Sequence, residues 1–387
     1  MSEAVNIPQV IDQLCKTHFG EPSFIVRSPG RINLIGEHTD YNLGFVLPAA
    51  IDKAIYVAIR KRNDQQVNLY AGDLNESFQT TLQQLTKSDR QWPDYILGVA
   101  DQLIKAGQLI GGFDAVVMGD VPLGAGLSSS AAVECATVFA LNSLFELGLD
   151  RKQMVLYAQK AENEFVGVQC GIMDQFASMF GQSNQVIRLD CRSLEYAYMP
   201  FDTGDIQILL FDTGVKHSLA SSEYNLRRQE CEAGVAIIQK KYPEVKSLRD
   251  ANSQMVEECL AGGAPKIYNR CRYMVEEIAR LQEGCEDLQR HDLVSFGKKM
   301  FETHDGLSNL YEVSCKEADG LVAMVRNHPG VIGARMMGGG FGGCTLNIVK
   351  KEAVDTLIKE VAAAYAAQFN RELKTYRVSI DNGTSIL

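Results

Sequence analysis

The sequence lacks the patterns that mark several protein classes. Among its 387 residues no apolar run is long enough for a membrane-spanning helix, so we expect no membrane partner. The first residues show no basic segment followed by an apolar one, so no signal peptide is expected. The ten cysteines include no CxxC pair, and the chain is long for a disulfide scaffold. These absences favour a cytoplasmic protein with reduced thiols.

The sequence also has no excess of positive charge. Lys and Arg together number 38 and Asp and Glu number 48, so the formal net charge is −10. Proteins that bind nucleic acids usually have a basic face, and its absence argues against a nucleic-acid partner. An acidic protein that binds phosphate groups must hold them with local features: backbone N–H groups, a metal ion or a few placed cations.

The order of secondary-structure patterns predicts an α+β fold with two lobes, and the length suits two domains. Strand-like segments alternate with helical ones up to about residue 211, whereas residues 219–325 are mostly helical. A last strand is expected at 374–380, and it could pair in either lobe. We assign residues 1–200 to the first lobe and 201–387 to the second.

The first motif is a dense group of polar residues between apolar runs at 28–51. It contains Arg31, and the consecutive residues Glu37, His38, Thr39 and Asp40 offer two carboxylates, an imidazole and a hydroxyl. Such a density of hydrogen-bonding groups beside apolar residues suits recognition of a polyol. A solvated loop is the simpler alternative, and one His with two carboxylates is only a weak metal pattern.

The second motif, DVPLGAGLSSSAA at 120–132, follows a predicted strand and opens a predicted helix. Gly124 and Gly126 allow a tight turn, and three serines lie at the helix N-terminus, where free N–H groups attract anions. The pattern predicts a phosphate site. It lacks the GxxxxGK[ST] of a Walker A loop, and the HRD and DFG of protein kinases are absent from the chain. A simple N-cap on a long helix is the alternative interpretation.

The third motif, RMMGGGFGGC at 335–344, formally contains GxGxxG. A dinucleotide-binding version must open a helix, but the residues that follow have a strand pattern. The third motif therefore fails the context test for a dinucleotide-binding loop, which argues against that interpretation. A Gly-rich turn that closes over a ligand and a flexible hairpin tip both remain open.

Two carboxylates and one tyrosine between these motifs are further candidates. Asp174 lies between apolar residues and is expected to be partly buried, so it needs a partner, and Arg31 is of the right type. Glu162 is likewise a carboxylate among apolar residues. Tyr224 belongs to an N-capped helix start and could face either the core or a cleft.

Together these segments resemble the galactokinase family of GHMP small-molecule kinases. GRINLIGEHTDYNLGFVLPAAI (30–51) resembles the family's N-terminal signature, PLGAGLSSSAA (122–132) its phosphate loop, and GGGFGG (338–343) its third motif. CGIMDQF (170–176) and SSEYNLRR (221–228) also resemble segments of the family. The resemblance covers nearly the whole chain in the expected order, and the first motif is the most specific.

The resemblance implies two α/β lobes with the active site between them, and transfer of the ATP γ-phosphoryl group to the C1 hydroxyl of α-D-galactose. Asp174 would accept the hydroxyl proton or orient the hydroxyl, and Arg31 would orient that carboxylate and stabilise the transferring group. Implied sugar contacts are Glu37, His38, Thr39, Asp40, Gly171, Asp174 and Tyr224. Implied ATP contacts are Gly124, Ala125, Gly126, Leu127, Ser128, Ser129, Ser130 and, beside the adenine, Trp92. Implied ligands of Mg²⁺ are Ser130 and Glu162.

Three alternatives stay open at this point. Relatives that phosphorylate N-acetylgalactosamine or arabinose share nearly the same first motif. A non-catalytic galactose sensor with this fold would be expected to have a damaged phosphate loop, whereas residues 126–131 are intact here. A dinucleotide-dependent oxidoreductase is suggested only by the third motif. A monomer is favoured.

Overall fold

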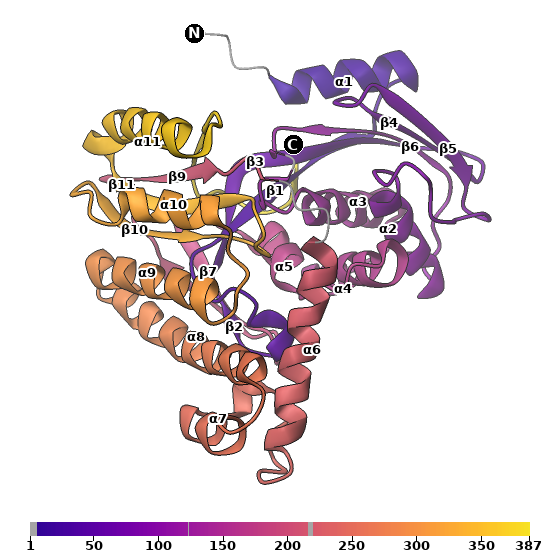
Figure 1. Cartoon of the computed structure of the whole chain (residues 1–387). Coiled ribbons are helices and arrows are strands. Elements are labelled where there is room, and N and C mark those ends of the chain that lie inside the picture. Colours follow the sequence, from indigo (N-terminus) through magenta and orange to yellow (C-terminus); the bar gives the residue numbers. More distant parts are fainter. Residues whose placement is uncertain (1–5, 123, 216–219) are drawn as a thin grey trace.

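The computed structural model describes residues 6–122, 124–215 and 220–387. Leu123 of the second motif lies outside the described residues. Within the described chain, helices and three sheets form two parts, and the larger two sheets are in contact where β12 approaches β3 (Figure 1). No helix in these residues is both long and apolar enough to cross a membrane.

The first sheet has the strand order β13-β1-β3-β6-β4-β5 in the described residues. Neighbouring strands are antiparallel, apart from β4 and β6, which run parallel. The strands are β1 (Phe24–Asn33), β3 (Pro48–Lys61), β4 (Gln66–Ala71), β5 (Glu76–Thr81), β6 (Phe113–Gly119) and β13 (Ser385–Ile386). β1 and β3 form the long central pair, and β1 contains the first residues of the first motif.

Helices cover both faces of this sheet. α1 (Ile7–His18) packs on β3 and β6 from one side (Figure 1). The other side is covered by α2 (Asp94–Lys105), α3 (Ser129–Phe145), α4 (Arg151–Lys160) and α5 (Met173–Phe180), with a π-helical turn, η2, at Ala161–Val166. α3 contacts β1 and β3 on one side and the neighbouring helices on the others. Its sequence is apolar all round and free of Gly and Pro, as expected for a helix enclosed in this way.

The second sheet, in the order β10-β11-β9-β12, is antiparallel throughout the described part. Its strands are β9 (Ile206–Asp212), β10 (Val331–Met336), β11 (Cys344–Lys350) and β12 (Lys374–Val378). One face packs on α9 (Leu293–Asn309), and the other on α10 (Lys316–Val325) and α11 (Val354–Phe369), which follows the short η4 (Lys351–Ala353). Alternate residues of β9 face opposite sides, as Ile208 and Leu209 do.

The remaining elements form a small third sheet, a group of three helices and two short turns. β2 (Phe45–Val46), β7 (Gln185–Asp190) and β8 (Tyr196–Pro200) form a small third sheet. α6 (Ala220–Ile238), α7 (Ser253–Leu260) and α8 (Pro265–Gln289) pack together around their own apolar cluster (Figure 1). Two short turns complete the described elements: η1 (Asp40–Asn42) and η3 (Leu248–Asp250).

The end of the chain answers the question that the sequence left open. The strand expected at 374–380 is β12, and it pairs with β9 in the second sheet. The chain then returns to the first part, where β13 pairs with β1, so that Ile386 lies opposite Val26. The division at residues 200 and 201 falls between β8 and β9, and we keep it as a proposal with the C-terminal strand assigned to the first lobe.

Thr384 fastens this returning segment, and its replacement should lower stability. Its hydroxyl donates to the Ser178 carbonyl at 2.9 Å and lies 2.9 Å from the Ser28 hydroxyl, with all three residues fully buried. We expect Thr384→Val to reduce the free energy of unfolding by about 1–3 kcal/mol, because it removes two buried hydrogen bonds and leaves the Ser28 hydroxyl without its partner. Urea unfolding measures this change.

Two comparisons make the measurement specific. Thr17→Val removes a hydroxyl on the exposed face of α1 and should change stability little. The double variant Ser28→Ala, Thr384→Val should lose less than the sum of the single variants, because the two hydroxyls are partners. Equal losses for Thr17→Val and Thr384→Val would contradict the assignment.

Candidate active site

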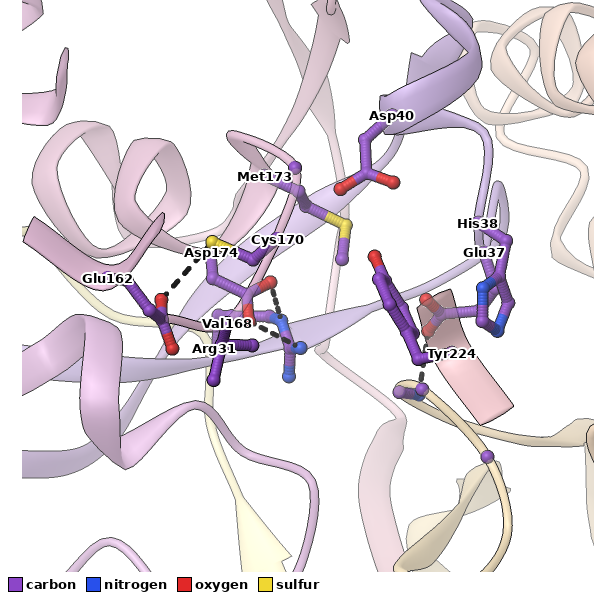
Figure 2. A pocket seen from close by; sticks show the side chains of 14 residues that line it. Arg31, Glu37, His38, Asp40, Glu162, Val168, Cys170, Met173, Asp174 and Tyr224 are labelled. Carbon is purple, nitrogen blue, oxygen red and sulfur yellow. Dashed lines mark hydrogen bonds and ion pairs between the residues drawn. The ribbon is translucent and has the colours of Figure 1, made fainter. Parts of the chain in front are cut away.

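A cavity of about 310 Å³ lies between the first and third motifs, and Figure 2 shows its side chains. The first motif contributes the end of β1 and the loop after it, η2 and α5 contribute one wall, and α6 and the Gly-rich turn contribute the other. The lining residues are Arg31, Glu37, His38, Asp40, Glu162, Val168, Cys170, Gly171, Met173, Asp174, Tyr224 and residues 338–340.

A paired arginine and aspartate form the base of the cavity (Figure 2). Arg31 donates from Nε to Asp174 Oδ1 at 2.8 Å and from Nη2 to Oδ2 at 2.9 Å. Arg31 is almost fully buried, and although burial opposes its charge, Asp174 and Glu37 raise its pKa above the ordinary value. A two-point arginine–carboxylate pair fixes both orientation and charge. The partner that the sequence suggested only by residue type is therefore in place.

The phosphate-type loop touches the same pair. Arg31 Nη1 donates to the Gly126 carbonyl, and the Ser128 hydroxyl donates to Asp174 Oδ2. The loop reaches this position because Gly30 has no side chain: a Cβ there would lie 2.7 Å from the Leu127 carbonyl oxygen. The backbone N–H of Arg31 donates to that same carbonyl at 3.1 Å. The first two motifs are thus joined backbone to backbone as well as through side chains.

The loop itself has the geometry expected of an anion site. Gly124, Gly126 and Ser128 all have positive φ, and α3 begins directly after Ser128. This conformation points the N-terminus of a long helix at the loop, where its free N–H groups favour negative charge. Ala125 and Leu127 are buried, so only their backbone is available to a ligand.

Glu37 links the first motif to the third. Its Oε1 accepts from Arg335 Nη2 and from the Gly338 N–H at 2.8 Å. Arg335 is completely buried, and the sequence patterns did not predict a role for it in the site. Its only sequence signal is a charged residue near the end of an apolar strand, separated from the glycines by two methionines. In addition, Glu277 of α8 accepts from the Gly36 N–H at 2.7 Å and so fixes the loop that follows β1.

Asp40 and Gly171 face each other across the cavity wall. A Cβ on Gly171 would lie 1.8 Å from Asp40 Oδ2, so no larger residue fits at this position. Burial and the charge of Asp174 raise the pKa of Asp40 to about 7. A hydrogen-bond acceptor is therefore held here at a pKa close to neutral pH.

His38 and Tyr224 complete the wall opposite Asp174 (Figure 2). Burial and the charges of Arg227 and Arg335 lower the pKa of His38 to about 3, while the Gly339 backbone acts in the opposite direction. His38 is therefore neutral. The Tyr224 ring lies 5.2 Å from the His38 ring, which settles its direction in favour of the cleft. Thr39, by contrast, does not line the cavity: its hydroxyl donates to the Gly36 and Phe45 carbonyls.

A second, mostly apolar cavity of about 170 Å³ lies on the other side of the phosphate-type loop. Trp92 and Tyr95 line it together with Ser129 and Ser130. The Trp92 indole N–H donates to Glu76 Oε2 at 2.9 Å, which fixes the ring. The two cavities meet at one contact, because Ser130 of the second cavity hydrogen-bonds Glu162 of the first.

Ser130 and Glu162 are also the residues that would hold a divalent cation. Burial and Asp174 raise the pKa of Glu162, and Gln175 Nε2 donates to its Oε2 at 2.7 Å. Nearby Glu134 is fully buried, and its Oε1 has no hydrogen-bond partner in the described residues. Buried carboxylates beside a hydroxyl fit a hard cation such as Mg²⁺. The described residues contain no cluster of three or more metal-type ligands, so phosphate oxygens would have to complete the shell.

Family models match most of the chain. The GHMP kinases N terminal domain matches residues 94–182, the galactokinase galactose-binding signature residues 16–61, and the GHMP kinases C terminal domain residues 285–367. A galactokinase of Roseiflexus sp. (strain RS-1) is 40% identical over 95% of this chain and 94% of its own length. The chain belongs to the galactokinase family.

Other members and solved structures agree with this assignment. A galactokinase of Thermotoga maritima is 39% identical over 92% of this chain and 98% of its own length. The structure of Lactococcus lactis galactokinase complexed with galactose has a TM-score of 0.94 at 33% identity, covering 98% of this chain and 100% of that one. A mevalonate kinase structure, at 18% identity and a TM-score of 0.65, shares the fold. The expectations of a two-lobed GHMP kinase fold and of an ATP-dependent sugar kinase are confirmed.

Asp40 should make the ligand-free enzyme less stable at alkaline pH. An acid whose pKa rises on folding, here from 3.8 to about 7, destabilises the native state as pH increases between those values. We expect Asp40→Asn to raise the thermal midpoint at pH 8, by the equivalent of about 1–4 kcal/mol. At pH 5 the gain should shrink, because the native carboxyl is then protonated. Thermal melts without ligand at both pH values measure the effect.

The matched control is Asp89→Asn, which removes an exposed carboxylate. It should shift the midpoint little at either pH. A gain for Asp40→Asn that is equal at pH 5 and pH 8, or a loss at pH 8, would show that burial of this charge has no net cost.

Proposed function

We propose that this kinase transfers the γ-phosphoryl group of ATP to the C1 hydroxyl of α-D-galactose, giving galactose 1-phosphate and ADP. The observation that carries the proposal is the junction at Asp174. Its carboxylate lies in the cavity lined by the galactose-type motif, and Ser128 of the phosphate loop donates to it. An acceptor hydroxyl and a donor phosphate therefore have a common meeting point. The Lactococcus lactis galactokinase, which this chain resembles over nearly its whole length, forms a complex with galactose.

The polar cavity is the proposed sugar site. Glu37, His38, Asp40 and Tyr224 line it with carboxylates, an imidazole and a phenol, which suits a ligand with several hydroxyls. The Gly171 backbone approaches Asp40 where no side chain would fit, and this makes the wall rigid. Thr39 is left out of the proposed contacts, because its hydroxyl is bound to the backbone.

ATP is proposed to bind across the phosphate loop. Its base would occupy the apolar cavity beside Trp92 and Tyr95, and its phosphates would lie against the N-terminus of α3. We propose Mg²⁺ as the cofactor, held by Ser130 and Glu162. When bound, the cation supplies neutralisation of phosphate charge. The net charge of −10 makes such local neutralisation necessary.

Catalysis would then rest on placement and charge. Phosphoryl transfer needs in-line positioning and stabilisation of the equatorial oxygens more than covalent assistance. Asp174 would orient the C1 hydroxyl and accept its proton as the bond to phosphorus forms. Arg31 keeps Asp174 in one orientation with two hydrogen bonds and carries a positive charge at the point of transfer. Ser128 would hold the second carboxylate oxygen.

We also propose a cytoplasmic monomer. ATP is a cytoplasmic substrate, and all ten cysteines are free thiols. The groups proposed to bind the sugar, the base and the cation are already supplied by this chain, so the proposed site calls for no second subunit.

A substrate panel tests the proposed acceptor. ADP release would be measured with galactose, N-acetylgalactosamine, arabinose and glucose, with ATP and Mg²⁺ in each case. We expect the highest kcat/KM for galactose and only background hydrolysis without sugar. Faster turnover of another sugar would replace galactose as the substrate, and no sugar-dependent release at all would favour a non-catalytic sensor.

Asp174→Asn tests the proposed role of the carboxylate. The variant keeps the shape of the side chain but loses its charge, so we expect galactose binding to persist while kcat falls by about 10²–10⁴. Calorimetric titration with galactose and the ADP assay measure the two effects separately. Asp114→Asn is the control, since Asp114 is also buried and paired with an arginine, Arg62, but lines neither cavity. Near-normal kcat in Asp174→Asn would refute the role.

A further inference from the structure

Glu37 is held by the second part of the molecule at one of its two carboxylate oxygens. Its Oε1 accepts from Arg335 Nη2, near the end of β10, and from the Gly338 N–H at 2.8 Å. A guanidinium group and a backbone N–H have no acceptor atom, so both can only donate. The direction of these two hydrogen bonds is therefore fixed.

The other carboxylate oxygen of Glu37, Oε2, is open to a ligand. No described residue donates a hydrogen bond to it, and it is not one of the enclosed side-chain atoms that lack a partner. Glu37 lines the cavity but is otherwise buried, with 2% of its surface exposed. Oε2 is therefore the oxygen that a molecule in the cavity can reach.

The backbone around Glu37 is fixed as well. The Gly36 N–H donates to Glu277 at 2.7 Å, and the Glu37 carbonyl accepts from the Tyr273 hydroxyl at 3.3 Å. Tyr273 and Glu277 are both fully buried on α8. Because the main chain is held by α8 and Oε1 is held by the Gly-rich turn and β10, the carboxylate has little freedom to turn. Oε2 keeps one direction.

The contact of Arg335 with Glu37 differs from that of Arg31 with Asp174. Arg31 places two nitrogens on two oxygens, the geometry that gives the strongest pair. Arg335 gives one nitrogen to Glu37 and its Nε to the Met336 carbonyl at 2.9 Å. Its Nη1 is enclosed and has no partner in the described residues. A pair that served stability alone would be expected to use both oxygens, whereas this one leaves an oxygen for a ligand.

We propose that Arg335 is a positioning residue for sugar binding: together with the Gly338 N–H it occupies Oε1 of Glu37, so that Oε2 faces the cavity as a fixed acceptor for a sugar hydroxyl. Arg335 does not line the cavity and acts through Glu37. The inference rests on the proposed function in one respect, namely that a sugar occupies the cavity. Without the arginine, the buried carboxylate of Glu37 would lose its charged partner, and Oε2 would no longer be fixed.

The effect of Arg335 should fall on binding rather than on phosphoryl transfer. Glu37 and Asp174 lie on different sides of the cavity, as Figure 2 shows. The hydroxyl that meets Glu37 is therefore not the one proposed to react at Asp174. An interaction that is equally strong before and during the transfer step changes KM and leaves kcat unchanged.

The first test replaces the arginine. Arg335→Met keeps the buried stem but removes the donor to Glu37, and calorimetric titration should show galactose binding weakened about 10- to 100-fold. The ADP assay should show the galactose KM raised by a similar factor, with kcat within about 3-fold of wild type and the ATP KM nearly unchanged. Arg335→Lys should be intermediate, because lysine keeps the charge but cannot serve Glu37 and the Met336 carbonyl in the same fixed geometry.

The double variant Glu37→Gln, Arg335→Met separates positioning from folding. Urea unfolding should show it to be more stable than Arg335→Met, because it leaves no buried charge without a partner. Its galactose affinity should nevertheless stay as low as that of Arg335→Met, because the fixed carboxylate acceptor is gone. Recovery of galactose affinity together with stability would overturn the proposal, since it would show that Arg335 serves folding alone.

Arg62→Met is the matched control. Arg62 also pairs with a buried carboxylate, that of Asp114 at 2.9 Å, and it lines neither cavity. Its replacement should lower stability and leave galactose binding unchanged. An Arg335→Met variant that binds galactose as tightly as wild type would overturn the proposal, and so would one that lowers kcat and raises both KM values together.

The wild-type titration distinguishes this inference from the proposed substrate. If the wild type binds another sugar of the panel in place of galactose, the proposed substrate is wrong, and the same variants are compared with that sugar. If galactose binds to the wild type and to Arg335→Met alike, the substrate stands and the positioning role is wrong. Binding of none of the four sugars to the wild type would overturn both.

Discussion

The structure depends most on the buried contact between Arg31 and Asp174. A buried charge is costly unless it is paired and hydrogen-bonded, and Arg31 meets both conditions with three separate acceptor atoms. Two of those atoms belong to α5 and one to the phosphate loop. The strand that carries Arg31 is thereby locked to the helix that carries Asp174 and to the turn before α3. Removing either partner would leave an uncompensated charge at the base of the larger cavity.

The other charges in the site follow from this pair. Asp40, Glu134 and Glu162 all have raised pKa values, chiefly through burial and in part through the negative charge of neighbouring carboxylates, Asp174 among them. The site thus holds more buried carboxyl groups than its own cations pair with. A magnesium ion would relieve that excess at Glu162, and sugar hydroxyls would donate to the carboxylates at Asp40. The ligand-free protein carries the free-energy cost of these poorly paired carboxyls. Ligands that pair with them would remove this cost, which would favour their binding.

Much of the candidate site could be predicted because its chemistry is concentrated in short motifs. Residues 30–42 and 124–130 each form one continuous segment, so a local pattern already places their groups together. Arg335 could not be found in this way. It is a single polar residue whose meaning comes from a distant partner, Glu37, at 298 positions along the chain. Thr39 shows the opposite case, since its place within the motif suggested a sugar contact but its hydroxyl is used by the local turn.

The fold shows the same division between local and long-range information. The strand at 374–380 has a clear pattern, but which sheet it joins depends on the edge that β9 leaves open. The Gly-rich turn is a second case in which long-range contacts determine the site. Gly338 donates to Glu37 of the sugar loop and also lies against Gly126 of the phosphate loop. Farther along the turn, a Cβ on Gly340 would lie 2.2 Å from the Val313 carbonyl oxygen. The turn is therefore fixed to the second lobe while it touches both loops of the first. A shift of either loop must be accommodated by the same few glycines, so the positions of the two loops are set together.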